Sequence, residues 1–395
     1  MPSVERKFTS VEICAGAGGQ AVGLHNALFR HLALIEVDPN ACSTLRNNVE
    51  GNSEWEGCEV IEADLTELDL AALRKKMRGK LGLVDEDNLE GKLDLLAGGV
   101  PCPPFSVAGK QLGADDERDL FPVMLAMVDS LRPKAVMIEN VRGLLDRKFE
   151  SYRHEIERDL KLMGYEKCFW DVLEAKDYGV PQLRPRAILV AMTEQYAKHF
   201  QRGGQVTGDT KTVAHALENT MRQRFDAVDD PRAGAAFERW REKASRDVAP
   251  TVVGGSKKHG GADLGPTRAK KAWLELGVCG LGVANEPEVM IDKERDLFAA
   301  AGPKLTVSQA AIIQGFPENW KFFGRKTAAY RQVGNAFPPP VAQAVGEWII
   351  AALEAGTDAS EYRGLNPLPE VTASSASVDA ACVDCCDDLE AARLR

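Results

Sequence analysis

The sequence predicts an α/β protein with a doubly wound, mostly parallel sheet and a second, smaller and irregular domain. Three observations indicate this. Short apolar runs alternate with helix-like stretches over the first 190 residues, several runs end in glycine or acidic residues, and the alternation fades after about residue 193. Strands separated by helices favour a parallel sheet. A chain of 395 residues is long enough for two or three domains.

The apolar runs and the stretches between them give the order of the expected elements. Ligands of such sheets bind beyond the carboxyl ends of the strands, so the polar residues that follow the runs are the expected site. The charged stretch 74–92 is expected to be a surface excursion. The expected strands are 11–14, 33–37, 93–97, 135–138 and 187–191, with a further strand ending at Asp64, and the expected helices include 41–48, 121–131 and 340–353.

The composition excludes several classes of protein. Collagen, coiled coil and wholesale disorder do not fit a chain with 44% hydrophobic and 27% charged residues. No apolar run approaches the roughly 20 residues that span a membrane, and the N-terminus lacks the apolar core of a secretory signal. Nine cysteines, an odd and scattered set, make a poor disulfide framework. We therefore expect a cytoplasmic protein.

The charge is distributed unevenly along the chain. The net charge is −10, and residues 357–395 carry eight acidic and three basic side chains, so half of the excess lies on a tail that we expect to be disordered. Residues 245–273 carry six basic and two acidic side chains within a glycine-rich stretch. This basic stretch is expected to belong to a separate module.

A glycine-rich turn at 14–19 follows the first expected strand. Glycine lets a ligand approach the backbone closely. Glu36 ends the next strand, where a carboxylate can accept both hydroxyls of a ribose, and Asp64 ends a third, where it can accept from an adenine amino group. Together they favour an adenosine-containing cofactor over the alternative, in which all three only cap helices or turns.

Three further elements carry reactive side chains. Cys102 stands between prolines on a loop after a strand, which suits a nucleophile held in one direction. Glu139 ends a strand, where desolvation can raise its pKa and let it donate a proton. Arg184 and Arg186 can grip phosphate or a base oxygen. The alternatives are a buried structural cysteine, a capping or salt-bridged acid, and a solvated basic edge.

These elements, in this order, resemble the C5-cytosine-specific DNA methyltransferase family of the bacterial restriction-modification type. The resemblance rests on Pro101-Cys102, Glu139-Asn140-Val141, Gln182-x-Arg184-x-Arg186, the stretch from Leu305 to Pro317, and Tyr330 to Ala336, and it extends over 8–193 and 303–353. It implies a methyltransferase fold that uses S-adenosylmethionine. It also implies methyl transfer to C5 of cytosine within a short specific sequence of double-stranded DNA.

The resemblance implies a cofactor pocket at the carboxyl ends of the first strands. The glycine-rich turn would line the methionine end, with Glu36 on the ribose and Asp64 on the adenine. Family members often carry Phe where Cys14 stands, so we expect one aromatic wall to be absent. The implied cofactor residues are Cys14, Ala15, Gly16, Gly18, Gly19, Glu36, Val37, Asp64, Leu65, Pro101, Leu120, Asn335 and Ala336.

The implied mechanism begins with attack of the Cys102 thiolate on C6 of a cytosine that has been flipped out of the duplex. Protonated Glu139 would stabilise N3, Arg186 would hold O2, and Arg184 would sit near the backbone. DNA contacts are implied for the loop after Cys102 and for the basic module, where a solvated basic face is the alternative. The expected contacts are Ser106, Lys110, Gln111, Thr251, Lys257, Lys258, Arg268 and Lys270.

The resemblance also predicts how the chain is organised. The expected parts are a catalytic and cofactor-binding domain (1–192), a target recognition domain (193–302), a return to the catalytic domain (303–356) and the acidic tail (357–395). We expect a monomer at the nucleoid of a prokaryote, paired in function with a restriction endonuclease where one is present. No metal site is expected, because Cys382, Cys385 and Cys386 lack a nearby histidine and a second cysteine pair.

Three alternative functions stay open on the sequence. The first is an RNA (tRNA) cytosine-5 methyltransferase of the same fold. The 110-residue region 193–302 argues against it, because a region of this size favours a reader of duplex DNA. The second is a catalytically inactive DNA-binding homologue, against which the intact Cys102, Glu139 and Arg186 argue. The third is a nicotinamide dehydrogenase, which the glycine-rich turn alone suggests and which leaves the other elements unexplained.

Overall fold

The computed structural model describes residues 6–84, 89–101, 119–204, 211–254 and 262–365, with 358–365 described by their backbone only. Contacts between Cα atoms divide the chain into two units, Met1–Thr357 and Asp358–Arg395. The sheet and all contacts of the site lie in the first unit. In the second unit the structure describes only the end of one helix.

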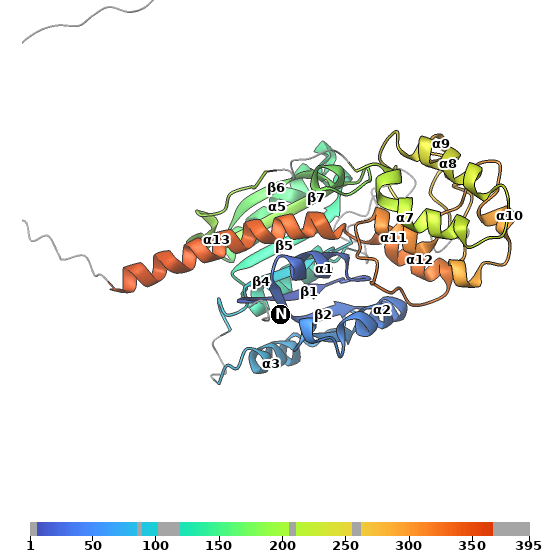
Figure 1. Cartoon of the computed structure of the whole chain (residues 1–395). Coiled ribbons are helices and arrows are strands. Elements are labelled where there is room, and N and C mark those ends of the chain that lie inside the picture. The colour runs from blue at the N-terminus through green and yellow to red at the C-terminus, as the bar shows by residue number, and fades with distance from the viewer. Residues whose placement is uncertain (1–5, 85–88, 102–118, 205–210, 255–261, 366–395) are drawn as a thin grey trace, which may run out of the picture. The chain divides into compact units, whose positions relative to one another are not determined.

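A seven-stranded mixed sheet forms the centre of the first unit (Figure 1). The strand order is β3-β2-β1-β4-β5-β7-β6, and β1 to β5 run parallel to one another. β7 runs antiparallel to both β5 and β6. The sheet confirms the expected fold class. The strands are β1 (Phe8–Ile13), β2 (Phe29–Glu36), β3 (Glu59–Glu62), β4 (Leu95–Gly98), β5 (Ala135–Val141), β6 (Tyr165–Glu174) and β7 (Pro185–Thr193).

One strand, β6, was not expected from the sequence. It is the edge strand next to β7, and most of its residues are exposed or half-buried. An edge strand buries less of each face than a central one, so the sequence of β6 mixes charged and aromatic residues and contains no apolar run longer than three residues. The apolar-run criterion that identified the central strands therefore does not detect it.

Helices cover the sheet and build the rest of the first unit (Figure 1). The helix expected at 41–48 begins earlier, because Pro39 starts it and the Asp38 carboxylate accepts hydrogen bonds from the next two amides. Part of 74–92, expected to be a surface excursion, is instead the end of α3. The helices are α1 (Gly19–Asn26), α2 (Pro39–Val49), α3 (Leu70–Lys80), α4 (Phe121–Leu131), α5 (Glu150–Leu162), α6 (Glu194–Ala197), α7 (Val213–Asp226), α8 (Ala233–Ala244), α9 (Thr267–Glu275), α10 (Lys293–Asp296), α11 (Val307–Ile313), α12 (Lys326–Asn335) and α13 (Pro339–Leu365).

The region 193–302 is more helical than its glycine content suggested. Its described residues hold helices α6 to α10 and no strand. In α7 the residues Val213, Leu217, Met221 and Phe225 are all buried at a spacing of four, which is the periodicity of an amphipathic helix. The composition of the region concealed this periodicity, so an irregular fold was expected where a helical one forms.

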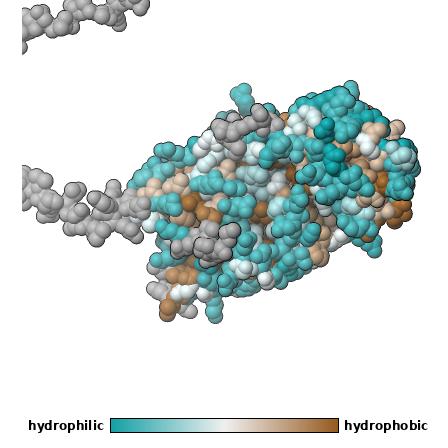
Figure 2. Space-filling view, in the orientation of Figure 1, coloured by the Kyte–Doolittle hydropathy of each residue, from teal (hydrophilic) through white to brown (hydrophobic). Residues whose placement is uncertain are grey.

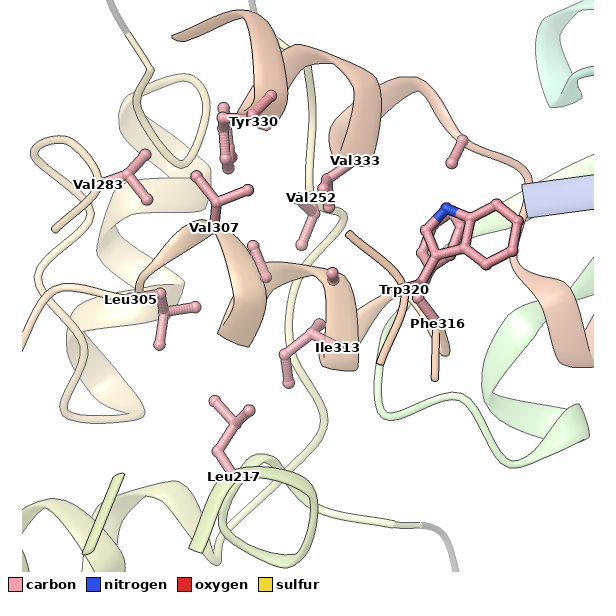
Figure 3. Packing of buried hydrophobic residues seen from close by; sticks show 14 of the residues in the cluster. Leu217, Val252, Val283, Leu305, Val307, Ile313, Phe316, Trp320, Tyr330 and Val333 are labelled. Atoms are coloured by element: carbon pink, nitrogen blue, oxygen red, sulfur yellow. The ribbon is translucent and has the colours of Figure 1, made fainter. Parts of the chain in front are cut away.

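Three buried clusters of apolar residues hold these elements together. Two lie on opposite faces of the sheet, and α13 packs into one of them. The third runs from the glycine-rich turn through Phe316 and Trp320 to helices α7 to α9. Figure 3 shows this third cluster around α11, with Leu217 pointing toward Ile313. The region 193–302 is therefore joined to the sheet by a continuous apolar core.

The surface carries few large apolar side chains. The face seen in Figure 2 is mostly hydrophilic, with scattered apolar patches. Single exposed apolar residues such as Val84, Leu162 and Ile291 account for part of the apolar surface and are normal for a folded protein. No helix in the described ranges is both long and apolar enough to cross a membrane.

Two buried histidines are linked to the glycine-rich turn through two tryptophans. The rings of His25 and His31 stack on Trp55, and Trp55 contacts Trp320, whose indole N–H donates to the carbonyl of Ala17 at 2.9 Å. His31 Nε2 lies 3.0 Å from the carbonyl of Ala21, which can only accept, so Nε2 carries the proton and Nδ1 accepts from a serine hydroxyl. Burial lowers the pKa of His25 to about 4 and that of His31 to about 3.

These histidines should make the protein sensitive to acid. Their folded-state pKa values lie below the unfolded value of about 6.5, so their contribution to stability is complete above that pH and is lost as the pH falls below it. We expect the free energy of unfolding in urea to fall by about 2 kcal/mol between pH 7.5 and 5.5 from these two groups. The H31Q variant should lose about half of this pH dependence, whereas H215Q, at an exposed position, should keep all of it.

Candidate active site

The glycine-rich turn expected after β1 is present, and its backbone is left-handed at several positions. Gly16 and Gly18 have φ of 55° and 89°, and Cys14 has φ of 49°. Such values favour glycine. The Glu36 carboxylate at the end of β2 fixes the turn, because it accepts from the amide of Gly16 at 2.7 Å and from the amides of Val37 and Asp38 at 2.9 and 2.8 Å.

A cavity of about 250 Å³ lies between this turn, the ends of β2, β4 and β5, and helix α12. Seven of the expected cofactor residues line it: Cys14, Ala15, Gly16, Gly19, Glu36, Asn335 and Ala336. The other six lie outside its lining: Gly18, Val37, Asp64, Leu65, Pro101 and Leu120. The catalytic candidate Glu139 also lines the cavity, so the cofactor candidates and one reactive candidate share one space.

The Asp64 carboxylate has local partners instead of facing the cavity. It is exposed and accepts from the amide and the hydroxyl of Thr66 at 2.9 and 2.7 Å. Both hydrogen bonds lower the pKa of Asp64, and the one from the hydroxyl has the larger effect. In this geometry Asp64 caps a turn, which is the alternative to adenine binding that the sequence left open.

The cavity contains buried polar atoms that were not expected from the sequence. Glu12 and Gln20 are 1% and 4% exposed and both line the cavity. Glu12 Oε2 and both amide atoms of Gln20 have no hydrogen-bond partner among the described residues. Burial, and then the charge of Glu36, raises the pKa of Glu12 well above its ordinary value. Buried polar atoms are normally paired, so this cavity fits a ligand with polar groups at its end.

Helix α12 contributes more of the lining than the sequence motif suggested. Arg331 and Gln332 line the cavity together with the expected Asn335. They stand four and three residues before Asn335, which places them one helical turn away on the same side. The spacing of three and four residues in the sequence is the signal that could have predicted them.

A buried ion pair lies at the end of β5. Arg186 Nε is 2.7 Å from Glu139 Oε1, and the two side chains are 13% and 14% exposed. The antiparallel register of β5 and β7 sets Val141 opposite Arg186, which brings the two side chains together. Burial raises the pKa of Glu139 although Arg186 and then Arg184 lower it. Burial therefore favours the protonated form of this carboxyl group more than water does.

Arg184 has a different environment from Arg186. Its side chain is 1% exposed, and Nη1 donates to the carbonyl of Val252 at 2.6 Å. Nη2 donates to the carbonyls of Gly334 and Ala336 at 2.8 and 2.9 Å. The guanidinium is thus occupied by the protein backbone and does not line the cavity. The residue lies just before β7, and its place among the catalytic residues stays a prediction.

Several expected residues lie outside the described part of the chain. They are Cys102, Ser106, Lys110, Gln111, Lys257 and Lys258. The residues on either side of 102–118 are described. The amide of Leu120 donates to the carbonyl of Pro101 at 3.2 Å, and Asn140 Nδ2 donates to the carbonyl of Val100 at 2.9 Å. Pro101 is the last described residue before Cys102, and these two hydrogen bonds fix the segment 100–101 beside the strand that carries Glu139.

Three of the expected DNA contacts are described, and they differ from one another. The Thr251 hydroxyl donates to the carbonyl of Leu183. Arg268 is exposed on α9, with no ion pair to any described residue. Lys270 forms an ion pair with Asp263 at 2.8 Å, so its charge is already partly neutralised within the protein. Of these two basic residues, Arg268 is therefore the one whose charge is more available to a phosphate.

The comparisons with known proteins assign the family. The model for C-5 cytosine-specific DNA methylase matches residues 8–351. The chain belongs to this family. The methylase is 48% identical over 362 residues to the type II methyltransferase M.NaeI of Lentzea aerocolonigenes, covering 91% of this chain and 79% of that protein. It is 45% identical over 353 residues to M.NgoMIV of Neisseria gonorrhoeae, covering 88% and 99%. The expected enzyme class, a DNA cytosine methyltransferase, is confirmed.

Solved structures share the fold of the methylase at low sequence identity. A methyltransferase of Entamoeba histolytica superposes with a TM-score of 0.58 at 14% identity, over 88% of this chain and 99% of that one. A mutant of Spodoptera frugiperda DNMT2 gives 0.57 at 15% identity, over 87% and 100%. The family and the fold together imply S-adenosylmethionine as the methyl donor, and the cavity with its unpaired polar atoms fits such a group.

The methylase should lose affinity for its cofactor when Gly19 is replaced. A Cβ at Gly19 would lie 2.2 Å from the carbonyl oxygen of Phe337, which also lines the cavity, so G19A must push the turn and Phe337 apart. We expect binding of S-adenosylhomocysteine, measured by calorimetry, to weaken about tenfold or more. G79A is the control, because a Cβ there meets nothing within 4 Å. Equal affinity in a folded G19A protein would contradict this account of the cavity.

Proposed function

We propose that this enzyme transfers a methyl group from S-adenosylmethionine to C5 of cytosine within a short specific sequence of double-stranded DNA. The proposal includes a covalent bond between Cys102 and C6 of a cytosine flipped out of the duplex. The observation that carries it is that the Glu139–Arg186 pair, 2.7 Å apart, adjoins the same cavity as Glu36 and the glycine-rich turn. A base placed at the pair would therefore face a cofactor held by the turn.

The chain's own residues are suited to hold the cofactor. Glu36 would accept from the ribose hydroxyls while its oxygens keep the turn in place. Glu12 Oε2 and the side-chain amide of Gln20, which line the cavity and have no partner among the described residues, would be available to the polar methionine end. S-adenosylmethionine, when bound, supplies an electrophilic methyl group on a sulfonium.

The protein's task on the base is to make C5 nucleophilic. Attack of the Cys102 thiolate on C6 forms a carbon–sulfur bond and moves electron density to C5 and toward N3 and O2. Protonated Glu139 would donate a hydrogen bond to N3, and Arg186 would hold O2. Burial favours the protonated acid that this role requires. Arg184, committed to backbone carbonyls, would have no contact with the base.

The region 193–302 is proposed as the target recognition domain, inserted between the catalytic parts 1–192 and 303–356. Its support is the local excess of positive charge at 245–273 and the exposed Arg268 of α9. Phosphate contacts position a protein on DNA, and base-edge contacts give specificity. The type II names of M.NaeI and M.NgoMIV favour a role in restriction and modification, with a partner endonuclease. A monomer acting at the nucleoid in the cytoplasm stays part of this proposal.

Bisulfite sequencing tests the proposed function. A plasmid is treated with the purified protein and S-adenosylmethionine, and tRNA is treated in parallel. We expect protected cytosines in one short sequence of the DNA and none in the tRNA. Protection of the tRNA alone would support the RNA methyltransferase alternative, and protection of neither would support an inactive DNA-binding homologue.

The C102A variant should lose turnover and keep its cofactor. The residue would form the bond to C6, and the substitution leaves every described residue of the cavity lining unchanged. We expect tritiated methyl transfer to fall by at least about a thousandfold, with the dissociation constant for S-adenosylhomocysteine within about threefold of wild type. C168A, on the edge strand β6, is the matched control and should keep full activity. Full activity in C102A would exclude the covalent mechanism.

Arg268 and Lys270 should differ in their effect on DNA binding. Each phosphate contact contributes about 0.9 to the slope of log affinity against log salt. R268Q should lower this slope by about 1, whereas K270Q should change it less, because Asp263 already pairs with that lysine. Fluorescence anisotropy of a labelled duplex between 50 and 300 mM salt, roughly the range where such slopes are measured, gives both values. Identical slopes for R268Q and wild type would remove Arg268 from the interface.

A further inference from the structure

Arg184 joins two segments that are far apart in the sequence. One of its terminal nitrogens donates to Val252, and the other donates to Gly334 and Ala336. Removing the side chain would leave three buried carbonyls without this donor. Lysine cannot replace it fully, because a planar guanidinium directs several donors at once and an ammonium is a single point charge.

The same two segments touch through their backbones. A Cβ at Gly334 would lie 2.2 Å from the amide nitrogen of Gly254, and a Cβ at Gly254 would lie 2.7 Å from the carbonyl oxygen of Arg331 and 2.3 Å from Asn335 Oδ1. Neither glycine has a positive φ, so close packing and not backbone conformation calls for glycine here.

Two buried glutamines extend this contact. Gln182 Oε1 accepts from the amide of Val252 at 2.8 Å, and Gln182 Nε2 donates to Gln314 Oε1 at 2.5 Å. Gln314 Nε2 in turn donates to the carbonyls of Val333 and Ala336 at 2.8 and 3.0 Å. We call the set of Arg184, Gln182, Gln314, Gly254 and Gly334 the arginine junction. All five residues are buried.

The arginine junction lies between the two proposed binding sites. On one side, Arg331, Asn335 and Ala336 line the cofactor cavity. On the other side, the segment 252–254 directly precedes 255–261, which carries the expected DNA contacts Lys257 and Lys258. A shift of either segment must therefore be taken up by the junction, since protein interiors are close-packed.

We propose that Arg184 is a positioning residue that couples DNA binding to cofactor binding by holding the 252–254 segment against the wall of the cofactor cavity. This inference rests on the proposed function, because it requires both ligands. Coupling is reciprocal: the factor by which bound DNA raises the affinity for the cofactor equals the factor by which bound cofactor raises the affinity for DNA. A side chain that only stabilises the fold would change unfolding and leave this factor unchanged.

The test measures the coupling factor directly. Calorimetry gives the dissociation constant of S-adenosylhomocysteine without DNA and with a saturating 30-base-pair duplex, a length of roughly three helical turns, that carries the methylated sequence. We expect the wild-type protein to bind S-adenosylhomocysteine more tightly with the duplex by about fivefold or more, and R184K to bring this ratio close to one. R224K is the matched control. Arg224 is 2% exposed and also donates to a backbone carbonyl, at Lys304, but it has no hydrogen bond to the 252–254 segment or to 331–336.

A second variant covers the case in which R184K does not fold. G254A keeps Arg184 and pushes apart the two segments that it joins, so it should also lower the coupling factor, whereas G234A, where a Cβ meets nothing within 4 Å, should not. A wild-type factor of one, or an unchanged factor in a folded R184K or G254A protein, overturns the proposal. Failure of the wild-type protein to bind S-adenosylhomocysteine or DNA at all would instead contradict the proposed function.

Discussion

The close packing of α1 on the start of α13 is the constraint on which the site depends. Three glycines permit it. A Cβ at Gly19 or Gly23 would lie 2.2 or 2.3 Å from a carbonyl oxygen of the segment 337–339, and a Cβ at Gly346 would lie 2.8 Å from Ala27. This contact brings residues near the two ends of the described chain to one wall, so that the cavity is formed only when the whole catalytic unit has folded.

The chemistry of the site follows from where charge is buried. The Glu139 carboxyl experiences two opposed effects, since desolvation favours its neutral form and Arg186 favours its charged form. The net direction is toward the neutral acid, and a base in the site would displace further water. The same rule explains Glu12, which lies deeper and has a second carboxylate, Glu36, as neighbour.

Much of the catalytic unit could be predicted from the sequence, and the misses have physical causes. Central strands bury both faces, so β1, β4, β5 and β7 stand out as apolar runs, whereas the edge strand β6 does not. The glycine-rich turn was identified because close approach to the backbone requires glycine, and Glu36 because a carboxylate at a strand end can accept both hydroxyls of a ribose. Glu12 and Gln20 were missed, since a polar residue inside an apolar strand or helix carries no local sign of what it faces. Asp64 pairs with Thr66, two residues away, as the capping alternative had it, whereas the pairing of Lys270 with Asp263 depends on the loop between them.

Arg184 and Arg186 stand two residues apart and would be read together in any sequence comparison. One donates to backbone carbonyls in the core, and the other pairs with a carboxylate at the cavity. Under the proposed mechanism, natural selection would act on the two positions by different routes, through the order of the joined backbone segments at the first and through the chemistry on the base at the second. A search for inactive clones would recover both arginines alike, and only ligand-binding measurements on each folded variant would separate them.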